Sequence, residues 1–276
     1  MSDDTPIERR AYELTAWRVA GPAEAIPLLL YHRLDLAGPK PAVVYYHGVT
    51  QSKDAYVDTH PLARRLTDAG FVVAIPDAPG HGERPSGATL IARLRESLPH
   101  EFCLDVEQAA DESPTLLDWL ASRLDVDGGR LGVVGVSMGG FTAAVVAARA
   151  RDRLRAAVCV AGSADLPRCL AETDSIAPGK WGPPDRSLDG ETRARIARID
   201  PLGYPEQYAP LPLLVLHGDR DTWNPCATSE RFAAAVQPGY AAHPEAFRLT
   251  IVPAAPHWPP NPTIVQEAVE WLRYHV

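Results

Sequence analysis

The sequence predicts a single α/β domain built on a mostly parallel, doubly wound sheet. Short apolar runs recur along the chain, and stretches with helical periodicity lie between them. The length supports the same prediction, because 276 residues are enough to bury a substantial core in one domain. We therefore expect residues 1–276 to form one domain with strands at its centre and helices on both faces.

The elements can be predicted in chain order. Residues 11–34 hold two β-rich stretches separated by the turn-forming GPAEA, which predicts a leading antiparallel pair. Six nearly continuous apolar runs follow, as expected of strands buried on both faces of a parallel sheet: 42–48, 71–77, 131–137, 156–162, 212–219 and 247–253. Five stretches with helical periodicity accompany them: 61–69, 105–124, 139–151, 228–237 and 263–274.

One interval, 163–209, interrupts this alternation. It contains no strong strand, is rich in Pro, Gly, Asp and Arg, and includes one short helical piece, ETRARIARI. Compact domains rarely hold loops of this length unless the loops are functional. We expect a cap inserted after the strand at 156–162, with an ordinary long crossover as the alternative.

Composition and charge argue against a nucleic-acid-binding protein and against a membrane protein. Hydrophobic residues make up 46% and charged residues 22%, which is typical of a globular protein. The net charge of −8 does not favour binding to nucleic acid or to an anionic membrane, and no apolar run reaches the ~18–20 residues of a membrane-spanning helix. The first ten residues are polar and charged, unlike a signal peptide, and the four cysteines are widely separated. These features predict a cytoplasmic protein with free thiols and no metal site, and they leave the oligomeric state open.

The strongest chemical signal is the segment GVSMGG at 135–140, directly after one apolar run and directly before a helical stretch. A serine becomes a good nucleophile only when a base takes its proton and its oxygen is presented without obstruction. A sharp strand-to-helix turn presents the oxygen, and it requires small residues two positions away on either side, here Gly135 and Gly139. This context predicts Ser137 as a catalytic nucleophile, with a structural Gly/Ser turn as the alternative.

With this segment the sequence resembles the α/β-hydrolase superfamily over nearly its whole length. Four segments, HGVTQSKD, PDAPGHGER, GVSMGG and HGDRD, look like the small bacterial serine carboxylesterase branch related to dienelactone hydrolases and to the catalytic domains of prolyl oligopeptidases. Dienelactone hydrolases carry a cysteine nucleophile, whereas this chain has serine. The resemblance implies an α/β-hydrolase fold and a carboxylesterase that requires no metal or organic cofactor.

The resemblance also implies the partners of Ser137, because the superfamily uses the order nucleophile, acid, histidine. The acid often lies in a segment similar to HGxxDxxVP, and HGDRDTWNP at 217–225 places it at Asp221, with Asn224 instead of the usual valine. Asp219, two residues nearer the strand, is the alternative. His257 follows the last predicted strand and precedes the last helix, where the superfamily carries its base. We expect Ser137, Asp221 and His257 to form a catalytic triad.

The oxyanion hole is predicted from the same resemblance, and the substrate pocket from aromatic residues near the triad and in the expected cap. The backbone N–H of Met138 follows the nucleophile, and HG-x after the first parallel strand implies the N–H of Val49 as the second donor. Trp223, Trp258 and Trp181 are expected to contribute to the substrate pocket, although large aromatic residues more often fill cores or brace loops.

Three functions remain open at this point. The first is a carboxylesterase for small-molecule esters with short to medium acyl chains. The second is a peptidase or thioesterase, which would hydrolyse amides or acyl-CoA faster than esters. The third is a non-catalytic binding protein that has kept the fold, which a complete triad in the right order disfavours.

Overall fold

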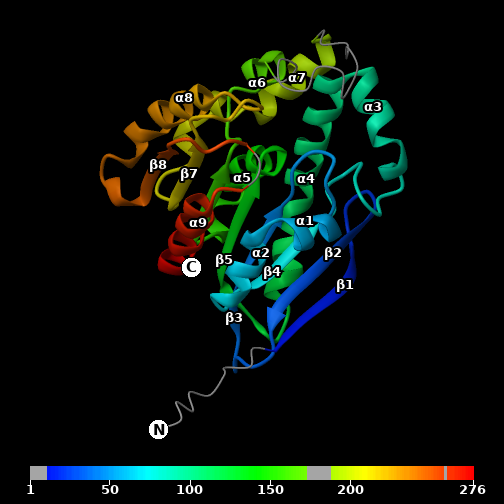
Figure 1. The fold of residues 1–276 in the computed structure, drawn as a ribbon, viewed down its shortest axis with the longest axis vertical. Helices are drawn as coiled ribbons and strands as arrows, with labels where there is room; N and C mark the ends of the chain where they lie inside the picture. Colours follow the sequence, from blue (N-terminus) through cyan, green and yellow to red (C-terminus); the bar gives the residue numbers. More distant parts are fainter. Residues whose placement is uncertain (1–10, 173–187, 258–259) are drawn as a thin grey trace.

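The computed structural model describes residues 11–172, 188–257 and 260–276. Within these residues eight strands form one sheet in the order β1-β2-β4-β3-β5-β6-β7-β8 (Figure 1). The strands are β1 (Tyr12–Ala20), β2 (Ala25–Arg33), β3 (Lys40–Tyr46), β4 (Val72–Pro76), β5 (Val126–Val136), β6 (Ala156–Val160), β7 (Leu213–Gly218) and β8 (Phe247–Val252). β1 pairs antiparallel with β2, and β2 with β4, while β4, β3 and β5 to β8 run parallel to one another. Both the predicted fold class and the leading antiparallel pair are confirmed.

Helices cover the sheet on both faces, which explains why the central strands are apolar along their whole length. One face packs against α1 (Lys53–Thr59), α2 (Pro61–Asp68) and α9 (Pro262–His275). The other packs against α4 (Leu98–Ala121), α5 (Met138–Arg149) and α8 (Cys226–Val236). The five predicted helices are present in these two layers.

Outside the interval 163–209, two described α-helices and the start of a third were not predicted. The short α1 has a mixed sequence without an apolar stripe, and the Ser52 side chain caps its N-terminus by accepting the N–H of Ala55. α3 (Leu90–Glu96) and the first two turns of α4 form a corner at Ser97. Pro99 lies in the first turn of α4, where a missing backbone N–H costs nothing, so the helix begins earlier than its apolar periodicity indicates.

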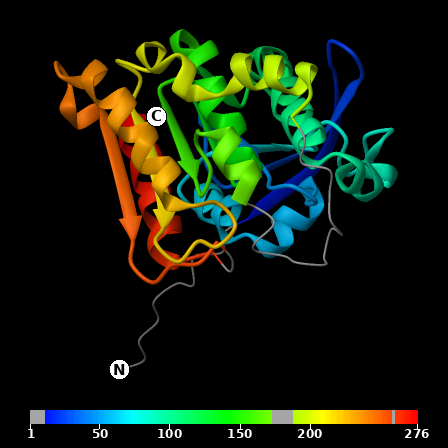
Figure 2. The same cartoon turned by 90° about the horizontal axis from the view of Figure 1, so that it is seen from above.

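The interval 163–209 contains two described helices, α6 (Leu166–Glu172) and α7 (Gly190–Ile199), and α7 confirms the predicted helical piece. α7 lies along α4 in both orientations (Figures 1 and 2). Glu107 of α4 forms ion pairs with Arg195 and Arg198 of α7, the second at 2.7 Å. Residues 173–187, between the two helices, are not described.

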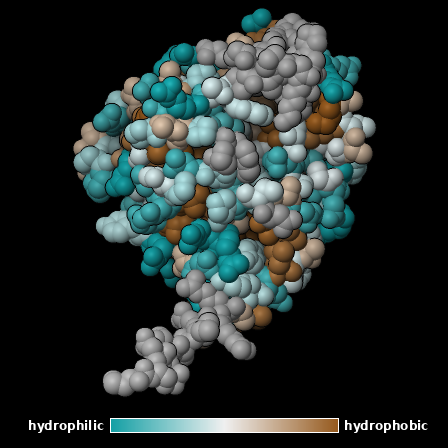
Figure 3. Space-filling view, in the orientation of Figure 1, coloured by the Kyte–Doolittle hydropathy of each residue, from teal (hydrophilic) through white to brown (hydrophobic). Residues whose placement is uncertain are grey.

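Hydrophilic residues cover most of the face shown in Figure 3, and hydrophobic residues appear there as separate patches. In the described part of the chain, no helix is long and apolar enough to cross a membrane. The apolar side chains gather instead in the two layers between the sheet and its helices.

Candidate active site

Ser137 occupies the turn between β5 and α5 with a backbone φ of 59° and ψ of −121°. Few residues other than glycine adopt a positive φ, so this conformation is strained and must be held by its surroundings. A Cβ added to Gly135 would lie 1.8 Å from the carbonyl oxygen of Gly139, and one added to Gly139 would lie 2.1 Å from that of Tyr46. The turn therefore excludes any side chain at these two positions, which explains the spacing of the glycines in the sequence.

The structure brings Ser137, His257 and Asp221 together in one hydrogen-bonded chain. His257 lies in the loop after β8, and its Nε2 is 3.0 Å from the Ser137 Oγ. Its Nδ1 is 2.7 Å from Oδ2 of Asp221, which lies in the loop after β7. Asp219, the alternative acid, is exposed. All three residues thus meet at the carboxyl ends of parallel strands, where ligands bind in open α/β sheets.

The carboxylate of Asp221 is fully buried and saturated with donors. Its Oδ1 accepts the backbone N–H groups of Trp223 and Asn224, at 2.8 and 2.9 Å. Burial alone would raise the pKa of Asp221, but hydrogen bonds from His217 and His257 outweigh burial and hold that pKa well below its usual value. Asp221 is therefore ionised, and it accepts a hydrogen from the Nδ1 of His257, which leaves Nε2 free to accept the proton of Ser137.

Two side chains around Asp221 were not predicted to matter. Asn224 was treated as a neutral replacement for valine, but its side chain is buried and donates to the carbonyl of Ala161 at 2.5 Å. His217 was noted only as part of the motif, yet it is fully buried and its Nε2 is 3.1 Å from Asp221 Oδ2. The sequence did contain a signal: a histidine at the end of an apolar run, four residues before Asp221.

The loop after β3 carries the predicted oxyanion donor Val49. Gly48 lies against the nucleophile, since a Cβ added there would be 3.5 Å from the Ser137 Cβ. Its carbonyl accepts the N–H of Gln51 at 3.2 Å and a hydrogen from the His47 ring at 2.9 Å. In a trans peptide the N–H points opposite to the C=O, so these bonds direct the Val49 N–H away from them. Its orientation is thus fixed by the loop itself.

The second predicted donor is the N–H of Met138. Met138 is the first residue of α5, where the backbone N–H has no acceptor within the helix. Across the described residues, neither this N–H nor that of Val49 donates a hydrogen bond to another protein group. Both are available for a negatively charged oxygen.

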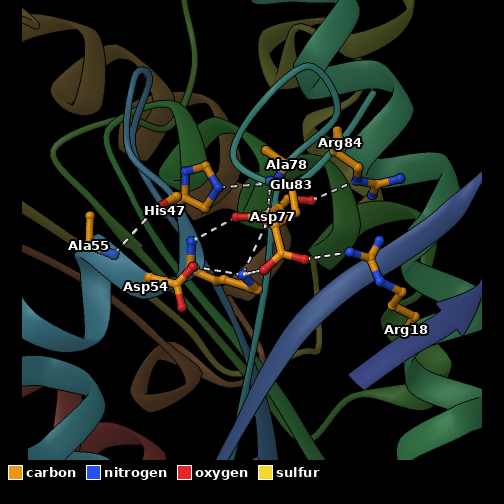
Figure 4. A network of polar contacts seen from close by, with 10 residues as sticks. Arg18, His47, Asp54, Ala55, Asp77, Ala78, Glu83 and Arg84 are labelled. Atoms are coloured by element: carbon orange, nitrogen blue, oxygen red, sulfur yellow. Dashed lines mark hydrogen bonds and ion pairs between the residues drawn. The ribbon is translucent and has the colours of Figure 1, made fainter. Parts of the chain in front are cut away.

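A buried polar network ties this loop to the segment after β4 (Figure 4). His47 accepts the N–H of Ala78 at 2.9 Å, and burial lowers its pKa to about 4, so the ring is neutral near pH 7. The fully buried carboxylate of Asp77 accepts the N–H groups of Lys53 and Glu83, at 2.8 and 2.9 Å. The loop between β3 and α1 and the segment that follows β4 are therefore held together as one unit.

Lys53 is the cation at the centre of this network. Its ammonium group is 2.7 Å from both Asp54 and Glu83 and 3.6 Å from Asp77, with only 2% of the side chain exposed. Burial would lower the pKa of Lys53, but the bonds to Asp54 and Glu83 and the charge of Asp77 raise it. Arg18 of β1 pairs with Glu83 at 2.5 Å and connects the leading hairpin to the same unit (Figure 4).

The sequence and the fold were compared with those of known proteins. Residues 62–275 match the prolyl oligopeptidase family. The chain belongs to that family. Esterase YjfP of Escherichia coli (strain K12) is 31% identical to it over 208 residues, which cover 72% of this chain and 75% of that protein. YitV of Bacillus subtilis (strain 168) is 27% identical over 239 residues, covering 86% and 89%.

A solved structure agrees with this family assignment at the level of the fold. A cold-adapted esterase from an Arctic intertidal metagenomic library superimposes with a TM-score of 0.64 and 17% identity, and the match covers 100% of both chains. This chain is therefore a serine hydrolase with the α/β-hydrolase fold.

Beside Ser137 this family member has a small cavity of about 30 Å³. The described residues that line it are mostly apolar: Val49, Leu94, Leu98, Phe102, Ser137, Cys169, Leu170, Trp223 and Asn224. Besides Val49 and Ser137, they come from α3, from the start of α4, from α6 and from the loop after β7. A wider groove of about 520 Å³ lies between α2 and α9 and includes none of these residues.

The three tryptophans predicted for the pocket can be compared with this cavity. Trp223 lines it and stacks on the ring of His257, with centroids 5.4 Å apart and an angle of 8° between the planes. Trp181 and Trp258 lie outside the described residues. The contribution of Leu94 and Leu98 was not predicted, because nothing near them in the sequence marks them as close to Ser137.

Proposed function

We propose that this protein is a carboxylesterase that hydrolyses small-molecule esters through an acyl-enzyme on Ser137. The observation that carries the proposal is the hydrogen-bonded chain from Ser137 through His257 to the buried, ionised Asp221. This is the arrangement that serine hydrolases use to generate a nucleophile. The named activity of the relative YjfP supports ester rather than amide substrates.

In the proposed mechanism each residue has one role. The His257 Nε2 takes the proton of Ser137 as its oxygen attacks the ester carbonyl, and Asp221 stabilises the imidazolium that forms. The backbone N–H groups of Met138 and Val49 bind the oxyanion. The ester bond then breaks, and the leaving alcohol takes its proton from His257. Water, activated by the same nitrogen, hydrolyses the acyl-enzyme and regenerates Ser137.

The cavity supports a preference for short, uncharged acyl groups. Its small volume of about 30 Å³ favours a short acyl chain over a long one, and none of its described lining residues is charged. Cys169 and Leu170 of α6 contribute to it, which supports our proposal that the interval 163–209 forms a cap over the site. The stacking of Trp223 on His257 supports a pocket role for this residue.

The test is hydrolysis of p-nitrophenyl esters of increasing acyl length by the native chain and by Ser137→Ala. We expect the fastest turnover with two to four acyl carbons, and a loss of about 10⁵-fold or more in the variant. Ser122→Ala, on the exposed C-terminal cap of α4, should behave like the native chain. Faster hydrolysis of amides or acyl-CoA than of esters would assign the second function, and activity that survives in Ser137→Ala would disprove the assigned nucleophile.

A further inference from the structure

Asp221 is shared by two imidazoles, of which the proposed mechanism uses only one. Its Oδ2 lies 2.7 Å from the Nδ1 of His257 and 3.1 Å from the Nε2 of His217. His217 is the fifth of the six residues of β7, and its side chain is fully buried. Among the described residues His217 forms no hydrogen bond with Ser137. Any effect of His217 on the reaction must therefore act through Asp221.

The hydrogen-bond partners of His217 determine its tautomer. The Nε2 faces two acceptors, the carboxylate of Asp221 and the backbone carbonyl of Asn224 at 3.0 Å, so this nitrogen carries a hydrogen. The Nδ1 is 2.7 Å from the Oγ of Ser229, whose hydroxyl can donate to it. The Ser229 oxygen is in turn 3.0 Å from the Oγ of Ser163, which can donate in the same direction. When His217 carries its single hydrogen on Nε2, its Nε2 has an acceptor and its Nδ1 has a donor.

The charge balance of the site also requires a neutral His217. When His257 becomes an imidazolium during catalysis, Asp221 is the anion that balances it, and a second cation on the same carboxylate oxygen would oppose that charge. The thiols of Cys169 and Cys226 also interact with Asp221 electrostatically, and burial raises the pKa of both, for Cys169 to about 12. They remain neutral, so they do not change this balance.

We propose that His217 is a positioning residue, which holds Oδ2 of Asp221 in the orientation that His257 needs, while Ser229 and Ser163 select its tautomer. β7 and α8 supply rigid anchors, because His217 lies in the strand and Ser229 in the helix. Two backbone N–H groups face Oδ1 and two imidazole nitrogens face Oδ2, and this arrangement favours a single orientation of the carboxylate. The inference rests on the proposed function, since it assigns His217 to the same hydrolytic reaction.

Two substitutions separate positioning from packing. His217→Met fills much of the same volume without a donor, and His217→Gln retains an N–H close to the place of Nε2. We expect His217→Met to lower kcat about 10- to 100-fold on p-nitrophenyl acetate, the range for a lost hydrogen bond to a charged group, with KM within about twofold. The acid limb of its pH profile should move to higher pH, because a carboxylate with fewer donors holds the proton on His257 more strongly. His217→Gln should recover most of kcat and most of the shift.

Ser229→Ala is the matched control for the tautomer, since it removes only the donor to Nδ1. It should lower kcat less than His217→Met and move the acid limb in the same direction. The proposal is overturned if His217→Met matches the native chain, or if both His217 variants lose kcat equally without a shift of the acid limb. Should His217→Met fail to fold, Ser229→Ala decides alone, because His217→Gln is expected to stay close to the native chain. A native kcat and pH profile in Ser229→Ala would then overturn the proposal.

A second readout keeps this inference separate from the proposed function. A fluorophosphonate reacts with an activated serine whatever the natural substrate: the Ser137 oxygen forms a bond to phosphorus, fluoride leaves, and His257 takes the proton. We expect labelling of Ser137 to be slower in His217→Met than in the native chain. Equal labelling rates would overturn the role of His217 alone, whereas no labelling of the native chain would contradict the proposed function itself.

Discussion

The loop with His257 and the loop with Val49 both reach Ser137, but different interactions hold them. On the His257 side a single buried carboxylate, Asp221, accepts three hydrogen bonds, one of them from His257, and the Nε2 of His217 lies 3.1 Å from its Oδ2. On the Val49 side the backbone is tied by the neutral ring of His47 and by an ion-pair network around Lys53. The first arrangement would stabilise the imidazolium of His257 that forms during the proposed reaction. The second holds the backbone N–H of Val49 in place. Substitutions on the two sides should therefore affect different measurements.

The largest expected effect is on the His257 side. Asp221→Asn should lower kcat on p-nitrophenyl acetate about 10⁴-fold, because a neutral amide cannot hold the same tautomer or balance the imidazolium. The variant should still fold, as judged by a circular dichroism spectrum like that of the native chain. Asp219→Asn, at the exposed neighbouring position, is the control and should cost far less. The reverse ranking would assign the acid to Asp219.

The next effect, on the Val49 side, should appear as stability. Asp77→Asn removes a buried anion near Lys53, and an amide oxygen and nitrogen cannot accept both backbone N–H groups that the carboxylate accepts. We expect the free energy of unfolding in urea to fall by about 3 kcal/mol. The kcat of the remaining folded enzyme should fall much less than in Asp221→Asn. A loss of kcat without a loss of stability would show that the network does more than hold the loop.

A further effect on the same side should depend on pH. Burial lowers the pKa of His47 to about 4 from 6.5, so between these values the unfolded chain binds a proton that the folded chain does not. Stability from His47 is therefore complete above pH 6.5 and falls by up to about 1.4 kcal/mol per pH unit as the pH is lowered toward 4.

His47→Gln lacks this dependence, so its difference from the native chain in free energy of unfolding should shrink as the pH falls. Other shifted groups remain in both chains and cancel in the comparison. These include His60, with a pKa lowered by burial to about 3, and Asp105, with a pKa raised by burial to about 8. A constant difference between pH 6.5 and 4.5 would mean that His47 does not contribute to the pH dependence of stability.

The smallest expected effect is that of Glu83→Gln. Glu83 bonds the same ammonium as Asp77 does, but 48% of its side chain is exposed, so solvent screens the interaction. The free energy of unfolding should fall by less than about 1 kcal/mol. A loss as large as that of Asp77→Asn would show that exposure does not rank the members of this network.

The parts of the molecule that could be predicted are those decided by local sequence. Apolar runs predicted β3 to β8, because a strand covered on both faces must be apolar along its length. The turn at Ser137 was predictable because its two glycines are required by contacts within a few residues and with the adjacent strand. Chain order and motif spacing indicated Asp221 and His257, and the structure brings both to Ser137.

What only the tertiary structure decided depends on residues far apart in the chain. His217 acquires its tautomer from Ser229 and Ser163, which lie on other elements, and no spacing in the sequence connects the three. The cavity wall from α3, α4 and α6 was equally hidden, because apolar residues such as Leu98 have the same pattern whether they line a pocket or a core. The sequence by itself determined the strands and the turn, since these follow from burial and backbone sterics along the chain. The tertiary structure decided how Asp221 and the loop with Val49 are held, since hydrogen bonds form wherever folding brings donors and acceptors together.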